Sequence, residues 1–360
     1  SIFFISSSAF SEVTMDRLAN AASEPQNWLT HHKTLDGARF VDLDEINRFN
    51  VKNMKVAYTI PLGDVAEGSD GLGSHQSTPL VKDGFMYATG LWDVVYKIDL
   101  RGDYPSIQWM FDPENDPEII GNPVTRGAAL WGNSVIINTE DGRVISIDDE
   151  TGEMNWETQI ATEQGEGFRA APLAVDDVIL VHNAFGDWGT RGWISGVSPE
   201  DGSELWRFFT VPAPGEPGSE TWTDAAQVAW KTGGAAAWVT GMYDTKTQQY
   251  FVGTGNPVPM FDPEFRPGDN LYSNALLAIN SQTGNLDWHF QYTPGDYLDY
   301  DEVGSHILMD VEYDGEMRKQ VTHFGRNGYY YQLDRTNGQF LSAVQYIEKL
   351  DWTEGIDPKT

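Results

Sequence analysis

The chain has 360 residues, of which 40% are hydrophobic and 12% aromatic, so it can bury a sizeable core and is neither disordered nor a coiled coil. Its formal net charge of -31 repels phosphate backbones and anionic lipids, which makes nucleic acid and membrane surfaces poor partners. The absence of cysteine excludes disulfides, thiolate metal sites and thiol nucleophiles.

The first eleven residues, SIFFISSSAFS, are typical of the end of a secretory signal peptide. They are apolar from Ile2 to Ile5, carry small residues at Ala9 and Ser11, and lack an initiator methionine. We therefore interpret residues 1–11 as a signal-peptide remnant and expect export to a periplasmic compartment. No later stretch is long and apolar enough to span a bilayer.

Five later segments share one pattern, in which an apolar run ends in an acid or its substitute and is followed by a glycine and then a tryptophan. The tryptophans are Trp109, Trp156, Trp206 and Trp288, and the fifth segment has Ser342 at that place. Successive marks are 47, 50, 82 and 54 residues apart, with a long insertion in the third interval. A repeat near 50 residues with paired short strands predicts an all-β fold of the β-propeller type.

Each repeat predicts one sheet of the propeller, which makes about five, the last of them incomplete. Residues 80–90, 173–183 and 245–255 have hairpin patterns, with Gly or Asp at two of the turns, and supply the inner strands. The repeated tryptophan is expected to pack between neighbouring sheets, and the repeated glycine to allow a tight turn. Residues 43–60 resemble an outermost strand without a repeat of its own. We therefore expect residues 12–360 to form a single propeller domain that is truncated at its C-terminus.

Several longer motifs carry a resemblance to a known family. They include STPLVKDGFMYATG from Ser77, GTRGWISG from Gly189, GTGNPVP from Gly253, TPGDYLDYD from Thr293 and GRNGYYYQLDRTNG from Gly325. Together they span most of the chain, and it resembles the quinoprotein alcohol dehydrogenases of the methanol dehydrogenase type, which use pyrroloquinoline quinone (PQQ). The resemblance implies an eight-bladed β-propeller, of which this chain would cover roughly the first five blades.

The resemblance also implies a metal site. It gives Asp187, Asn256 and Asp299 as ligands of Ca²⁺ or a similar hard cation, which prefers six or more oxygen ligands. Asp301 lies two positions after Asp299, where the lanthanide-dependent branch of the family has an additional carboxylate. Residues two apart project to the same side of an extended segment, so both could face one ion. The alternative is ordinary acidic surface, because the acids are scattered along the chain.

PQQ is a planar tricarboxylate, so it requires an aromatic surface and cationic or hydrogen-bonding edges. The resemblance assigns ring stacking to Trp238 and quinone contacts to Arg126 and Arg326. Gln76 replaces a family glutamate and Arg169 a family threonine, and we expect both to contact the cofactor.

These residues imply oxidation of a primary alcohol to an aldehyde. Asp299 would accept the hydroxyl proton as general base while hydride passes to metal-activated PQQ, and Arg326 would stabilise the developing oxyanion. Electrons would leave to a soluble c-type cytochrome, since no CxxCH motif for haem c is present in this chain. The resemblance leaves a homodimer open. Two alternatives also remain open: a non-catalytic propeller that binds proteins, and a PQQ dehydrogenase for sugars or polymeric alcohols.

Overall fold

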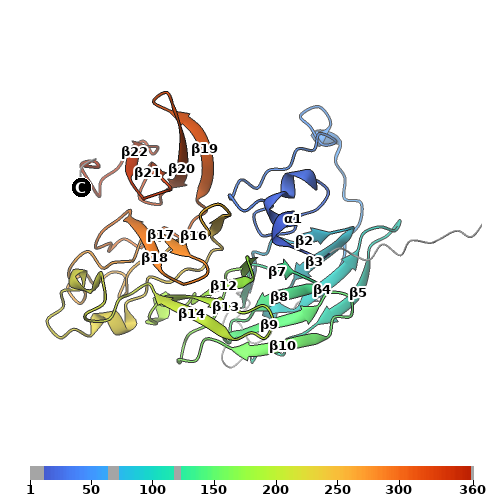
Figure 1. The fold of residues 1–360 in the computed structure, drawn as a ribbon, viewed down its shortest axis with the longest axis horizontal. Coiled ribbons are helices and arrows are strands. Elements are labelled where there is room, and N and C mark those ends of the chain that lie inside the picture. The colour runs from blue at the N-terminus through green and yellow to red at the C-terminus, as the bar shows by residue number, and fades with distance from the viewer. Residues whose placement is uncertain (1–11, 64–72, 117–122, 358–360) are drawn as a thin grey trace, which may run out of the picture.

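Five four-stranded antiparallel sheets follow one another in chain order around an arc (Figure 1). The computed structural model describes residues 12–63, 73–116 and 123–357. The strands of the first three sheets are β2 (Leu80–Lys82), β3 (Phe85–Thr89), β4 (Val95–Asp99), β5 (Ser106–Phe111), β7 (Ala129–Trp131), β8 (Ser134–Asn138), β9 (Arg143–Asp148), β10 (Met154–Gln159), β11 (Leu173–Val175), β12 (Val178–His182), β13 (Trp193–Val197) and β14 (Glu204–Phe209).

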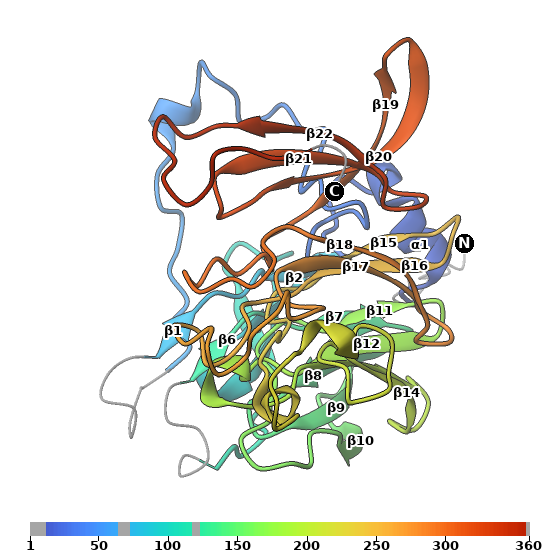
Figure 2. The ribbon, with the colours of Figure 1, turned by 90° about the vertical axis from the view of Figure 1, so that its left-hand side faces the viewer.

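The strands of the fourth and fifth sheets are β15 (Met242–Asp244), β16 (Gln249–Gly253), β17 (Ala275–Asn280), β18 (Leu286–Gln291), β19 (Ile307–Tyr313), β20 (Glu316–Phe324), β21 (Tyr329–Asp334) and β22 (Phe340–Gln345). A separate parallel pair joins β1 (Ser74–His75) to β6 (Val124–Thr125). In every large sheet each strand pairs with its sequence neighbour, and the view in Figure 2 shows the sheets layered against one another. This arrangement confirms the predicted all-β propeller architecture.

Short hairpins form the inner strands as expected. Leu80 pairs with Tyr87 across the turn between β2 and β3, and the turn residue Asp83 has a φ of 52°. Between β11 and β12, Asp176 and Asp177 both have positive φ, which is the backbone geometry of tight hairpin turns. The hairpin predicted from residue 245 begins slightly earlier, with β15.

The repeated tryptophans pack between sheets, as predicted. The indole nitrogens of Trp109 and Trp156 donate to the backbone oxygens of Asp149 and Pro199 in the next sheet, both at 3.1 Å. Trp206 donates to the Ser281 oxygen at 2.8 Å.

Each of the four tryptophan rings also covers the repeated glycine of the following sheet. A Cβ added to that glycine would lie between 2.5 and 2.8 Å from the ring, as it does at Gly152, Gly202, Gly284 and Gly338. All four glycines have φ between 72° and 76°, so these positions need glycine for the turn and for the close approach of the indole.

Two sequence-based expectations are wrong. The fifth sheet is not incomplete, because β19 to β22 form four paired strands. Residues 43–60 are not an outermost strand: they form turns, a short 3-10 helix η2 (Val51–Asn53) and unpaired extended chain, almost all of it exposed. A strand needs a neighbouring edge to pair with, and the described chain offers this segment none. Figure 1 shows it in light blue as a loop away from the sheets.

The N-terminal segment from residue 12 packs against the first strands. Val13 bridges Gly132, and Trp28 bridges Val81 of β2. The helix α1 (Met15–Ala19) buries Leu18 in the main core cluster. The other helical segments of the described chain are 3-10 turns, η1 (Ala21–Ser23), η3 (Leu91–Asp93), η4 (Gly186–Trp188), η5 (Ser219–Thr221) and η6 (Ala229–Thr232). Among the described residues, no helix has the length and hydropathy needed to cross a membrane. The predicted signal-peptide remnant at residues 1–11 lies outside the described residues.

Candidate active site

Three oxygen-bearing side chains from distant parts of the chain meet at one point, and we call Asp187, Asn256 and Asp301 the acid cluster. Asp187 lies in η4, Asn256 follows β16, and Asp301 lies in the loop after β18. The Asn256 backbone N–H donates to Asp301 Oδ1 at 2.9 Å. The Asn256 side-chain amide also faces Asp187 Oδ1 at 3.1 Å and Asp301 Oδ1 at 2.9 Å, and donates to both when its nitrogen is turned toward them.

The chemistry of this cluster suits a hard cation. When the Asn256 amide is turned the other way, its Oδ1 joins the two carboxylates, and the three side chains offer only oxygen to a shared position. Oxygen ligands of this kind are those that Ca²⁺ and similar ions prefer. Within the described residues no three His, Asp or Glu side chains converge closely enough to hold a metal by themselves. The cluster therefore consists of two carboxylates and an amide, and a cation there would need further oxygens.

The three aspartates of GDYLDYDEVG have different environments. Asp296 is buried and shapes the loop: its carboxylate accepts the backbone N–H groups of Leu298 at 2.8 Å and Tyr300 at 2.9 Å. Asp299 has a φ of 63°, so this segment is not extended, and the two-residue alternation expected from sequence does not decide where its side chain faces. Asp301 is buried in the acid cluster.

Charge couples Asp299 to the acid cluster without a direct hydrogen bond. Burial raises the pKa of Asp299, the charge of Asp187 raises it further, and Arg326 opposes both. Burial also raises the pKa of Asp301 to about 6, although the Asn256 N–H and Arg326 act in the opposite direction. Arg326 follows β20 and donates from Nη1 to Asp301 Oδ2 at 2.9 Å, with half of its side chain exposed. Asp299 is thus a partly exposed carboxyl group near the guanidinium of Arg326, which is hydrogen-bonded to Asp301.

Trp238 lies next to the acid cluster across Gly255. A Cβ added to Gly255 would lie 2.6 Å from Asp301 Oδ1 and 3.5 Å from Trp238 Nε1. The Gly255 N–H also donates to the Ala236 oxygen at 2.8 Å, which fixes the segment that leads to Trp238. The absence of a side chain at residue 255 therefore allows an aromatic ring and a carboxylate to lie side by side.

Two arginines lie beyond Trp238, and we call Arg126 and Arg169 the arginine pair. The Arg126 Cζ atom lies 5.0 Å from the centroid of the Trp238 ring, and its buried Nη1 has no hydrogen-bond partner among the described residues. Burial and the charge of Arg169 lower the pKa of Arg126 to about 10. Arg169 donates from Nε to Glu140 at 2.7 Å and lies over the ring of Phe185.

Gln76 is exposed at the edge of this region. Its backbone N–H donates to the Thr125 oxygen at 3.0 Å through the pairing of β1 with β6, which places it beside Arg126. Its side-chain nitrogen donates to Ser74 Oγ at 3.1 Å. The structure thus brings the predicted residues together in three connected groups: the acid cluster with Asp299 and Arg326, Trp238, and the arginine pair with Gln76.

Sequence reasoning missed several buried acids because it expected acids on the surface. Glu140 is 3% exposed, and burial raises its pKa to about 7 against the effect of Arg169. Asp93 is 7% exposed, and burial together with the charge of Glu140 raises its pKa to about 8. Glu302 is fully buried and accepts hydrogen bonds from the backbone of Arg326 at 3.1 Å and from His323 at 2.7 Å. No spacing in the sequence distinguishes these residues from exposed acids.

The comparisons with known proteins agree with this geometry. Residues 28–348 match the family model described as the β-propeller domain of glucose, ethanol and alcohol dehydrogenases, labelled PQQ. Quinoprotein alcohol dehydrogenase PedH of Pseudomonas putida is 33% identical over 99% of this chain and 61% of its own. The chain belongs to the PQQ-dependent quinoprotein alcohol dehydrogenase family.

Solved structures of this family are also similar. Quinohemoprotein alcohol dehydrogenase ADHIIG of Pseudomonas putida superposes with a TM-score of 0.89 at 33% identity, over 97% of this chain and 52% of its own. A europium-containing methanol dehydrogenase superposes with a TM-score of 0.87 at 29% identity, over 96% of this chain and 62% of its own. The chain therefore spans about half to three fifths of the length of these family members.

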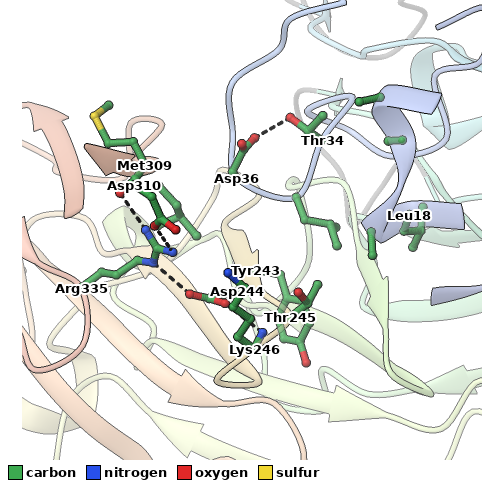
Figure 3. A pocket seen from close by; sticks show the side chains of 15 residues that line it. Leu18, Thr34, Asp36, Tyr243, Asp244, Thr245, Lys246, Met309, Asp310 and Arg335 are labelled. Atoms are coloured by element: carbon green, nitrogen blue, oxygen red, sulfur yellow. Dashed lines mark hydrogen bonds and ion pairs between the residues drawn. The ribbon is translucent and has the colours of Figure 1, made fainter. Parts of the chain in front are cut away.

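A separate cavity of about 370 Å³ lies between the N-terminal segment and the fourth and fifth sheets (Figure 3). Arg335 extends across it. Its guanidinium forms ion pairs with Asp244 at 2.9 Å and Asp310 at 2.7 Å, and donates a hydrogen bond to the Met309 backbone oxygen at 2.8 Å. No residue of the acid cluster or of the arginine pair lines this cavity. Arg335 thus links the fourth and fifth sheets across this cavity.

Proposed function

We propose that this chain forms the catalytic part of a PQQ-dependent dehydrogenase that oxidises a primary alcohol to an aldehyde. The observation that carries the proposal is the meeting of Asp187, Asn256 and Asp301 beside Trp238. A propeller that only binds proteins has no physical reason to bring the exposed carboxylate of Asp187 and the buried carboxylate of Asp301 to one amide next to an indole ring, because a buried charge is costly unless it is neutralised and two close carboxylates repel each other.

The acid cluster would hold the metal ion. Asp187, Asn256 and Asp301 supply oxygen ligands, and Asp299 is close enough for its pKa to respond to Asp187. A lanthanide ion or Ca²⁺ fits this donor set, and the additional carboxylate of Asp301 favours the ion of higher charge. One of the similar solved structures is a europium-containing methanol dehydrogenase, which supports the proposal.

The cofactor would lie on Trp238 with its carboxylates toward the arginine pair. The buried Nη1 of Arg126 has no hydrogen-bond acceptor among the described residues, and Gln76 and Arg169 border the same region. When bound, PQQ supplies the quinone that accepts the hydride of the alcohol.

Asp299 would act as the general base toward the alcohol. It must be ionised to accept the hydroxyl proton; burial and the charge of Asp187 raise its pKa in the protein without a cation, and a bound cation would favour the ionised form. Arg326, fixed by Asp301 and by the contact of its backbone with Glu302, would stabilise negative charge that develops near the base.

The wider setting is also part of the proposal. We infer an eight-bladed propeller to which this chain contributes five sheets, export to the periplasm and transfer of electrons to a c-type cytochrome. Several relatives bear the name quinohemoprotein alcohol dehydrogenase, which supports a haem protein as electron acceptor. A PQQ dehydrogenase for sugars or polymeric alcohols would use the same acid cluster and differ in its substrate loops.

The proposal is tested by reconstitution. The protein is incubated with PQQ and either Ca²⁺ or La³⁺; binding is followed by quenching of tryptophan fluorescence, and turnover by dye reduction with short alcohols. We expect quenching that requires the cation, and aldehyde formation. Absence of PQQ binding with either cation would contradict the proposed function, and turnover of sugars but not of short alcohols would favour the second candidate.

A further inference from the structure

The arginine pair is balanced by a single buried carboxylate. Glu140, in the turn between β8 and β9, accepts the Arg169 Nε–H at 2.7 Å and the Val124 backbone N–H at 3.1 Å through the same oxygen. Arg126 acts on Glu140 by its charge. Two guanidinium groups and one carboxylate therefore share a region with little access to water.

A second buried acid, Asp93, lies beside Glu140. The Glu140 backbone N–H donates to Asp93 Oδ2 at 3.2 Å, and the carboxyl groups of the two residues repel each other electrostatically. Asp141 adds a smaller repulsion on Asp93. Within residues 73–116 and 123–357, the charged groups that face Glu140 are thus Arg169, Arg126 and Asp93, on three different parts of the chain.

An anionic ligand at the arginine pair must compete with Glu140. Arg169 already donates to Glu140, and its guanidinium lies 4.6 Å from the centroid of the Phe185 ring, so its orientation is fixed from two sides. The buried Arg126 Nη1 lacks an acceptor, which marks where a carboxylate would be bound. A second carboxylate within this poorly hydrated region opposes the ionised form of Glu140 and favours its protonated form.

We propose that Glu140 is a proton-linked positioning residue: it holds Arg169 in the free protein and takes up one proton when a carboxylate of the cofactor occupies the arginine pair. This inference rests on the proposed function, because it takes PQQ as the anion. The balance is simple: one proton moves from solvent to the Glu140 carboxylate, the Arg169 hydrogen bond is shared or transferred to the ligand, and no covalent bond changes.

The direction of the pH dependence follows from this linkage. Burial raises the pKa of Glu140 to about 7 in the free protein, and the bound anion raises it further. Between those two values binding requires proton uptake, so affinity decreases as pH rises, by up to about tenfold per pH unit. Replacement of Glu140 by glutamine removes this contribution and retains a hydrogen-bonding side chain of similar size.

The test measures protons rather than activity. PQQ is titrated calorimetrically into the full chain at saturating Ca²⁺ near pH 7.5, in buffers of different ionisation enthalpy, and the dissociation constant is measured between about pH 6.5 and pH 8.5. The carboxyl groups of PQQ are ionised throughout this range. For the wild type we expect uptake of roughly half to one proton and weaker binding as pH rises.

Glu140→Gln should lose this proton uptake and show a flatter pH dependence of the dissociation constant. The matched control Glu153→Gln, at an exposed acid, should behave as wild type, and Asp93→Asn should retain uptake. Absence of uptake in the wild type, equal uptake in Glu140→Gln, or loss of uptake only in Asp93→Asn each overturns the inference.

Folding of the variants is controlled separately. If Glu140→Gln does not fold, the double variant Glu140→Gln with Arg169→Gln removes both members of the Glu140–Arg169 ion pair, and it too should bind PQQ without the proton. Retained uptake in that variant overturns the inference. If wild-type protein does not bind PQQ, the proposed function fails and this inference with it, whereas binding without proton uptake overturns the inference alone.

Discussion

Two regions of the molecule differ in how their contacts arise. The contacts between sheets repeat one pattern, whereas each contact in the acid cluster occurs once. Between sheets, one contact is repeated: an indole ring covers a glycine of the next sheet, at Trp109, Trp156, Trp206 and Trp288. In the acid cluster, Asp187, Asn256 and Asp301 occur once each and come from three different loops. The repeated contact stabilises the fold without reactive groups, whereas the unique contacts bring carboxylates together at a cost that a cation can offset.

The largest expected effect is a loss of turnover when Asp299, beside the acid cluster, is replaced. Asp299→Asn should lower kcat by about 100- to 10,000-fold, because an amide cannot accept the hydroxyl proton. The measurement is dye reduction by the reconstituted protein with a saturating short alcohol. Glu200→Gln, at an exposed acid, is the control and should leave kcat unchanged. An Asp299→Asn variant with full activity would remove Asp299 from the mechanism.

The next largest effect is a loss of stability when one of the repeated tryptophans between sheets is removed. Trp206→Ala should reduce the free energy of unfolding by about 3–5 kcal/mol, because it leaves a cavity against Gly284 and removes the hydrogen bond to Ser281. Urea unfolding followed by circular dichroism measures the loss. Trp188→Ala is the matched control, since that ring is 74% exposed and its removal should change stability by less than about 0.5 kcal/mol. Equal losses in the two variants would contradict the structural role of the repeat.

A buried histidine should make the sheets sensitive to acid. His182 on β12 bonds the Ala237 oxygen at 2.7 Å and the Tyr250 hydroxyl at 2.8 Å, and burial lowers its pKa from 6.5 to about 4. The unfolded chain therefore binds a proton that the native state does not, and stability falls as pH decreases from about 6.5 to about 4, by roughly 3 kcal/mol in total. His182→Gln should show a smaller fall over that range in urea titrations; an identical pH profile would rule out this role for His182.

The smallest expected effect is a weaker affinity for a lanthanide ion when Gly255, between Trp238 and the acid cluster, is replaced. Gly255→Ala would place a Cβ 2.6 Å from Asp301 Oδ1, so it should weaken lanthanide binding by about tenfold with little change in stability. Terbium luminescence sensitised by tryptophan reports the affinity. Gly102→Ala is the control, because its added Cβ meets only ordinary contacts. Unchanged terbium affinity in Gly255→Ala would separate Gly255 from the cation site.

The repeats could be predicted from sequence because their determinants are local. Gly152 and Trp156 lie four residues apart, and the hairpin turn at Asp83 is decided by adjacent residues, so both are visible as spacing. Prediction from local pattern failed for residues 43–60. Their apolar residues resemble those of a strand, but no neighbouring strand in the described chain pairs with them. Such prediction also failed for the fifth sheet, where a serine replaces the tryptophan although β22 is present.

The acid cluster was predicted through resemblance, not through local pattern. Asn256 contacts Asp301 across 45 positions of sequence, and Arg169 contacts Glu140 across 29. A carboxylate has the same chemical identity at the surface and in the interior, so the sequence could not separate Glu140 or Glu302 from the exposed acids. Their burial depends on what distant segments pack over them.

By itself the sequence determined an all-β repeat protein with tryptophan–glycine contacts between sheets, because periodic spacing is a property of neighbouring residues. Only the tertiary structure decided that Asp296 supports a loop, that Asp299 projects from a left-handed backbone position, and that Glu140 is buried against Arg169. These properties depend on the local dielectric environment and on backbone conformation, and both are established only when segments that are far apart in the chain come into contact.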